Sequence, residues 1–148
     1  MRIDQTPDFL ESVANHPRVF PYVTVRGVDV IKFAPIWHDC IAVVFDTGGW
    51  LFHRQADPDV YEVHTLFLPK STDVLAKAAA AKHFIFDQMH AKRLETLVAI
   101  DLPHVRRLAL RSGFKLTHRI TGMWPRESGP IDYDHFEITR ESWETKGD

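Results

Sequence analysis

The chain has 148 residues, 45% of them hydrophobic and 26% charged, which is the composition of one soluble globular domain with room for a core. A net charge of -2 gives no overall attraction to nucleic acid, and the single cysteine, Cys40, excludes an internal disulfide and a multi-cysteine zinc site. No run approaches the roughly 20 apolar residues of a membrane span, and the polar, acidic start does not resemble a secretory signal. We therefore expect a cytoplasmic protein without membrane or nucleic-acid partners.

The N-terminal third contains one clear helix signal. Residues 6–17 predict a helix in which Thr6 is the N-cap, Pro7 takes the first helical position and Pro17 ends it. Residues 19–35 mix β-branched residues with a helical spacing of apolar ones. We expect this second stretch to form an irregular or partly helical cover.

Three strands are predicted next. Residues 40–46 and 50–54 are short apolar runs joined by the turn cluster Asp46-Thr47-Gly48-Gly49, which indicates an antiparallel hairpin. Residues 60–68 form the third strand, which ends before Pro69. Because side chains alternate along a strand, Glu62 and His64 are expected to point to the same face.

A long helix follows, with Thr72 or Asp73 as its cap and an apolar face made of Val74, Ala78, Ala81, Ile85 and Met89. The rest of the chain predicts a strand at 94–100, a helix at 103–113, and strands at 114–121 and 133–139 around a loop at 122–130. Strand-helix-strand units favour parallel pairing in the middle, whereas hairpins favour antiparallel pairing at the ends. The predicted fold is a mixed α/β sheet with helices packed across it, in one domain spanning 1–148.

Three stretches together resemble the GNAT superfamily of acetyl-CoA-dependent N-acyltransferases. They are the strand "YEVHTLFLP", the helix that follows it, and "LPHVRRLALRSGFKLTHRI", which resembles the family's late helix ending in Gly-Phe. The pair "NHPRV" and "EVHTLFLP" is most similar to phage-encoded GNAT-type proteins. The resemblance implies a central mixed β-sheet of about six to seven strands with helices on both faces.

The resemblance also implies a function, the transfer of acetyl from acetyl-CoA to a primary amine. The pantetheine arm of the cofactor would pair with the strand edge at Leu66, Phe67 and Leu68. Its pyrophosphate would lie on the following loop and helix N-terminus, whose free amides and dipole favour negative charge. The residues around that pyrophosphate would be Ser71, Thr72, Asp73, Val74 and Leu75.

Two departures from the family pattern point to weak or lost activity. The loop has no glycine, although glycine lets the backbone approach a phosphate closely, and the Asp73 carboxylate would compete for the same amides. In the late helix, Ala109 stands where the family often has a tyrosine general acid, and Leu102 stands where it often has an asparagine. The alternative is therefore a non-catalytic GNAT-fold phage protein that binds a partner in the virion or associates with itself.

Glu62 is a candidate general base if burial raises its pKa toward neutrality, and His64 could take or assist that role. The alternative is that the two side chains simply pair. Four histidines on predicted strands could in principle bind a metal, but they lack a ligand motif and we expect no metal site: His53, His64, His118 and His135.

Two further groups of side chains have a structural and a functional interpretation. The arginines of the late helix, Arg106, Arg107 and Arg111, favour a solvated face over a contact with the cofactor's 3′-phosphate or an acidic partner. Trp37, Trp50 and Trp143 are expected in the core or an interface. Trp124 lies in the predicted loop between the last strands, so we expect it to contact a substrate or partner.

Overall fold

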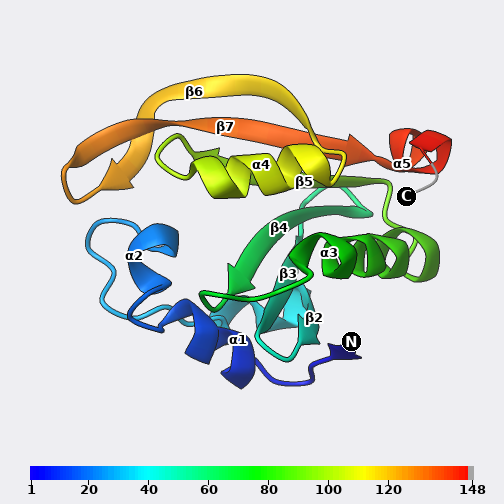
Figure 1. Cartoon of the computed structure of the whole chain (residues 1–148), viewed down its shortest axis with the longest axis horizontal. Coiled ribbons are helices and arrows are strands. Elements are labelled where there is room, and N and C mark those ends of the chain that lie inside the picture. Colours follow the sequence, from blue (N-terminus) through cyan, green and yellow to red (C-terminus); the bar gives the residue numbers. More distant parts are fainter. Residues whose placement is uncertain (147–148) are drawn as a thin grey trace.

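The β-branched and aromatic runs of the chain form a seven-stranded mixed sheet in the computed structural model, which describes residues 1–146 (Figure 1). Its spatial order is β1-β2-β3-β4-β5-β7-β6. The strands are β1 (Arg2–Ile3), β2 (Cys40–Phe45), β3 (Gly48–Arg54), β4 (Val60–Phe67), β5 (Arg93–Ala99), β6 (Lys115–Arg126) and β7 (Gly129–Thr139).

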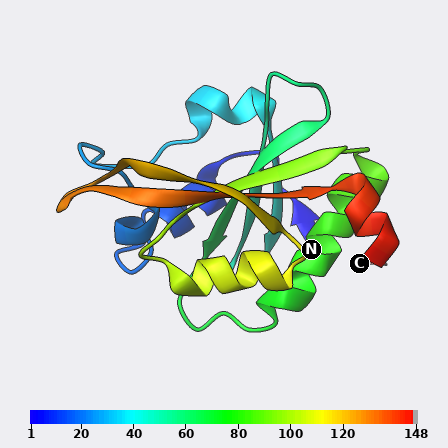
Figure 2. The same cartoon turned by 90° about the horizontal axis from the view of Figure 1, so that it is seen from above.

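Helices cover both faces of this sheet, as predicted. Side chains of β2, β3 and β4 alternate between a core shared with α1 and a larger core beneath α3 and α4. Figure 2 shows α3 and α4 together on one side of the sheet. The helical elements are α1 (Asp8–Ala14), α2 (Phe20–Val23), the 3-10 helix η1 (Ala34–Asp39), α3 (Val74–His83), the π-helical turn η2 (Phe84–Gln88), α4 (Pro103–Arg111) and α5 (Arg140–Lys146).

The parallel strands β4 and β5 pair only at their beginnings. Their register runs from Val60 opposite Arg93 to Glu62 opposite Glu95. Both strands continue beyond that point, to Phe67 and Ala99, without a further ladder pair in the described chain. The sheet is therefore open between the C-terminal halves of β4 and β5.

The first helix is shorter than predicted. Pro7, not Thr6, is its N-cap, and the Pro7 carbonyl accepts the hydrogen bond of the Glu11 amide. The helix ends before Asn15, whose side chain both donates to the Ile31 carbonyl and accepts from the Ile31 amide, at 2.8 and 2.7 Å. This pair of bonds anchors the segment at 19–35, which is the irregular, partly helical cover that the sequence predicted.

The predicted turn at 46–49 is wrong in length, because both glycines belong to β3. Gly48 pairs with Phe45, and Gly49 pairs with Val44. A Cβ atom at Gly48 would lie 2.2 Å from the Leu66 carbonyl oxygen, and one at Gly49 would lie 2.2 Å from that of Val43. Glycine is therefore used here for close approach of neighbouring strands.

The predicted loop at 122–130 is also wrong, because most of it extends the β6–β7 hairpin. Trp124 pairs with Ile131, and pairing continues to Arg126 opposite Gly129. β6 is an edge strand with a register shift between Ile120 and Trp124, and an edge with a bulge accommodates Pro125. No helix among residues 1–146 is long and apolar enough to cross a membrane.

Candidate functional site

The open half of β4 presents unpaired backbone groups to the gap beside β5. The Asp59 carbonyl accepts from the Lys92 amide, and the Val63 carbonyl accepts from Thr96 Oγ1 at 3.0 Å, so odd-numbered residues of β4 face β5. Alternation then directs the backbone groups of Thr65 and Phe67 to the same edge. Of the predicted edge residues, Phe67 therefore directs its backbone groups toward the gap, whereas the backbones of Leu66 and Leu68 face β3; the Leu68 amide donates to the Thr47 carbonyl.

The loop after β4 has left-handed backbone at two positions that are not glycine. The φ angles are 65° at Lys70 and 55° at Asp73. Glycine adopts this conformation without strain, whereas other residues do so rarely. Ser71 Oγ donates to the Leu68 carbonyl at 2.6 Å and lies 2.8 Å from Thr47 Oγ1, which fixes the middle of the loop. The loop thus keeps a glycine-like shape without glycines.

The N-terminus of α3 has free backbone donors. Asp73 occupies the N-cap position, but within residues 1–146 neither its side chain nor that of Thr72 caps the helix. Asp73 is therefore the N-cap by position, as predicted, but its carboxylate makes no capping hydrogen bond to the described amides. The amides of Val74, Leu75 and Ala76 donate to no described acceptor, so three N–H groups and the helix dipole remain available to an anion.

Glu62 and His64 form a pair on the other face of β4, with His64 Nε2 3.1 Å from Glu62 Oε1. The hydrogen bond from His64 lowers the pKa of Glu62 below its ordinary value and outweighs burial, which acts in the opposite direction. The expectation that burial raises the pKa of Glu62, which its role as a general base requires, is therefore wrong. His64 lines the adjoining cleft and is 42% exposed, so its ring is accessible to a bound molecule.

A cleft of about 940 Å³ runs along the open edge of β4. One wall is the segment from α1 through α2 to residue 33, and the opposite wall is the start of α4. Leu102, His104 and Trp124 all line it, although the sequence placed Trp124 in a loop. Tyr22 meets His104 edge to face, with ring centroids 6.4 Å apart. The cleft is large enough for a cofactor-sized ligand.

Arg126 holds two walls of the cleft together, a role that sequence reasoning missed. Its guanidinium bonds both carboxylate oxygens of Asp101, at 2.8 and 3.0 Å, and also donates to the carbonyls of Pro21, Tyr22 and Thr24. These bonds tie the end of the hairpin to the α2 segment, and Figure 1 shows that end of β6 and β7 next to α2. No local sequence pattern signals a contact between residues about one hundred positions apart.

The late-helix arginines do not form one solvated face. Arg107 and Arg111 are exposed, but Arg106 bonds the buried carboxylate of Asp134 on β7. The preferred interpretation is therefore wrong for Arg106. Ala109 is the buried residue of α4, and Leu102 is the N-cap of that helix.

The remaining predicted residues fall into structural positions. Trp50 is buried in the core, Trp143 stacks on Phe86, and Trp37 donates to the Gln5 carbonyl at 3.1 Å. His118 and His135 stack on each other across β6 and β7, whereas His53 and His64 lie on β3 and β4. Among the described residues, no group of three or more His, Cys, Asp or Glu side chains is placed to hold a metal ion.

The sequence matches no known family model and no curated protein. Solved structures do match in fold. A GNAT-family acetyltransferase from Bacillus anthracis superposes with a TM-score of 0.60 at 19% identity, covering 70% of this chain and 67% of that protein. A spermidine N-acetyltransferase from Vibrio cholerae gives 0.66 at 12% identity, covering 78% and 76%.

A protein described as a probable acetyltransferase matches over nearly the whole length, with a TM-score of 0.70 at 12% identity and coverage of 95% of this chain and 93% of that one. Identities this low establish the fold and leave the chemistry to the residues of the cleft. The chain therefore has the fold of the GNAT-family acetyltransferases.

Proposed function

We propose that this chain is an N-acetyltransferase that moves acetyl from acetyl-CoA to a primary amine. The observation that carries the proposal is the parting of β4 from β5 beside the paired Glu62 and His64. The gap supplies unpaired backbone for an extended amide-bearing ligand, and the pair supplies a base at the same place. The shared fold alone would not support this, because one fold hosts many functions.

The residues present fit the cofactor at both ends. The edge groups of Thr65 and Phe67 can pair with the amides of a pantetheine arm, flanked by the side chains of Leu66 and Leu68, which also line the cleft. The amides of Val74 and Leu75, with that of Ala76, can hold the pyrophosphate beside Ser71 and Thr72. Lys70 adds a positive charge, which offsets the negative charge of Asp73.

Acetyl-CoA supplies a thioester, so that attack of the amine nitrogen on its carbonyl carbon forms a C–N bond, breaks the C–S bond and leaves a thiolate. His64 accepts the proton that the amine loses. Glu62 holds the imidazole in place, and its lowered pKa keeps it a charged acceptor for the imidazole N–H. The thiolate needs no strong general acid, because a thiol with a pKa of about 8.5 is a good leaving group near neutral pH. This accounts for Ala109, which carries no proton donor.

The proposal is tested by titrating the purified protein with acetyl-CoA in a calorimeter and then assaying amine acetylation. We expect binding for the wild type and for the variant His64→Gln, with kcat lower by about 100-fold in the variant because the base is lost. His38→Gln, which changes an exposed histidine outside the cleft, is the matched control. Absence of binding at millimolar acetyl-CoA would overturn the proposal.

The second candidate is a non-catalytic phage protein that uses this fold to bind a partner or itself. The glycine-free loop and the missing hydroxyl at position 109 favour it. It predicts that neither acetyl-CoA nor CoA binds. An acetyl-CoA titration therefore discriminates between the two functions.

A further inference from the structure

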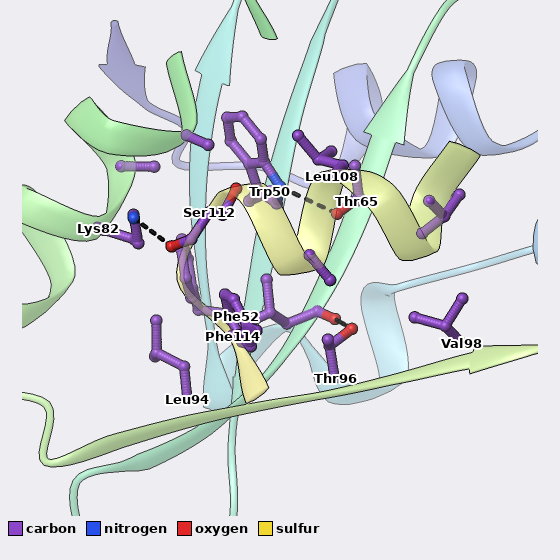
Figure 3. A pocket seen from close by; sticks show the side chains of 15 residues that line it. Trp50, Phe52, Thr65, Lys82, Leu94, Thr96, Val98, Leu108, Ser112 and Phe114 are labelled. Atoms are coloured by element: carbon purple, nitrogen blue, oxygen red, sulfur yellow. Dashed lines mark hydrogen bonds between the residues drawn. The ribbon is translucent and has the colours of Figure 1, made fainter. Parts of the chain in front are cut away.

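A small, partly open cavity lies behind the gap between β4 and β5, on the side of α3 and α4. Its volume is about 40 Å³. Figure 3 shows its walls, which come from the sheet on one side and from the two helices on the other. The apolar part of the wall is formed by Trp50, Phe52, Leu94, Val98, Ala109 and Phe114. None of these residues took part in the proposed catalytic machinery.

The cavity adjoins the large cleft. Five residues at or near the gap line both spaces: Val63, Thr65, Thr96, Val105 and Leu108. The amine would enter on the His64 side of β4, whereas the odd-numbered side chains of β4 point to the cavity side. A group bound at the gap is therefore next to both the cleft and the cavity.

Most polar groups in the cavity wall already have partners within the protein. Thr65 Oγ1 accepts from Trp50 Nε1 at 3.0 Å, and Thr96 Oγ1 donates to the Val63 carbonyl. Lys82 Nζ donates to the Ser112 carbonyl, a bond that Figure 3 also draws. Among the described cavity residues, Ser112 Oγ is the buried side-chain oxygen that makes no hydrogen bond. Apart from this hydroxyl and the Lys82 amine, the wall is made mainly of apolar side chains, so the space suits an apolar group.

We propose that this cavity receives the distal carbons of an acyl chain, so that the protein binds butyryl-CoA more tightly than acetyl-CoA. The inference rests on the proposed acyltransferase function. A group the size of a water molecule needs roughly 10–15 Å³ of cavity volume, so about 40 Å³ accommodates about three such groups. Ala109 contributes only a methyl group to the wall and leaves that volume unfilled.

The test compares the dissociation constants of CoA, acetyl-CoA, butyryl-CoA and decanoyl-CoA by calorimetry on the full chain. Each buried CH2 group is worth about 0.8 kcal/mol, so two additional groups predict binding about 15-fold tighter for butyryl-CoA than for acetyl-CoA. Decanoyl-CoA is expected to show no further gain, because the cavity is full before its chain ends.

A second part of the test uses variants that fill the cavity. In Ala109→Leu, the ratio of the two dissociation constants should fall from about 15 to near one, because the added carbons take the space of the acyl chain. Ala109→Val gives a milder filling if the leucine variant does not fold, as judged by its melting temperature. Ala80→Leu, on the exposed side of α3, is the matched control and should keep the wild-type ratio.

The outcomes separate the two claims. Equal or weaker binding of butyryl-CoA beside normal binding of acetyl-CoA overturns the cavity proposal and leaves the proposed function intact. An unchanged ratio in both filled variants also overturns it. Failure of CoA and of every thioester to bind overturns the proposed function together with the inference.

Discussion

The Asp134 carboxylate is held by two arginines from different elements. It is 1% exposed on β7, where Arg119 of β6 donates to it from Nε at 2.7 Å and Arg106 of α4 donates from Nη1. The hydrogen bond from Arg119 is the largest cause that holds the pKa of Asp134 below its usual range. One carboxylate therefore fixes α4 against the hairpin, next to the wall of the cleft.

Replacing Asp134 with Asn should lower the free energy of unfolding by about 2 kcal/mol, because it removes the buried charged acceptor of hydrogen bonds from two arginines that are themselves 38% and 50% exposed. The measurement is urea unfolding followed by fluorescence. Asp57→Asn removes a carboxylate that is half-exposed beside Lys92, and it should cost less than about 1 kcal/mol. Equal losses of unfolding free energy in the two variants would contradict a larger contribution from the buried Asp134 carboxylate.

The same variant has a defined pH dependence. Because the folded pKa of Asp134 is lowered, its contribution is present above the unfolded-state pKa near 3.9 and is lost as the pH falls through the folded value. The stability deficit of Asp134→Asn should therefore be complete at pH 7 and shrink below about pH 4. A deficit that grows on acidification would contradict this sign.

At the scale of one loop, charge and backbone strain can be separated. Asp73 has a left-handed backbone and places a carboxylate beside three free amides of α3. Asp73→Gly removes both the strain and the charge, and we expect it to bind acetyl-CoA about threefold more tightly, because a negative charge at a helix N-terminus competes with a phosphate. The measurement is the dissociation constant by calorimetry.

The chain offers a matched control for that variant. Asp59 has the same left-handed backbone, with φ 65°, in the turn before β4 and outside the cleft. Asp59→Gly relieves comparable strain without changing the charge near α3, so its dissociation constant should equal that of the wild type. Unchanged or weaker binding in Asp73→Gly would show that a phosphate does not occupy this helix N-terminus.

Local patterns predicted the elements well where one residue type determines the conformation. The alternation in β4 placed Glu62 and His64 on one face, and Pro103 with Gly113 bounded α4. The shape of the loop was not predictable, because left-handed residues are usually signalled by glycine and here they are Lys70 and Asp73. The absence of glycine suggested that the loop had lost its left-handed backbone, but Lys70 and Asp73 adopt that backbone in the structure.

Long-range contacts decided what the sequence missed. Pro125 and Gly122 suggested a loop, but an edge strand tolerates both, and Ile131 supplies the pairing that extends β6. The sequence predicted a solvated face for Arg106 because its partner, Asp134, is distant in the chain and lies on β7. Helical periodicity reports which residues share a face and not what packs against that face.

At the scale of the molecule, the gap in the sheet is the centre of the proposed site. The N-terminal cover, the β4 edge and the start of α4 surround it, and Arg126 ties the cover to the hairpin. The small cavity lies behind the same gap. Cofactor, amine and acyl chain would thus approach one opening from three directions, so variants can address each of them separately.

The charged residues of the cleft indicate which kind of amine it can accept. Among the described residues that line it there is no Asp or Glu, whereas Arg18 and Lys70 are present. The nearby carboxylates are already engaged, Asp101 by Arg126 and Glu62 by His64. A polyamine would bring several positive charges into a wall without counter-charge.

We therefore expect a monoamine with an apolar body, such as phenethylamine, to have a kcat/KM at least about 100-fold above that of spermidine, since two uncompensated contacts of about 1.4 kcal/mol each account for that factor. The expected acceptor differs from spermidine, which the Vibrio cholerae protein of similar fold acetylates.

Arg18→Glu should raise the kcat/KM for spermidine, and low salt should enlarge the gain because charge interactions are then less screened. Arg111→Glu changes the net charge equally at an exposed site outside the cleft and should leave the ratio of the two amines as in the wild type. A wild-type preference for spermidine would show that the amine binds on a surface other than this cleft wall.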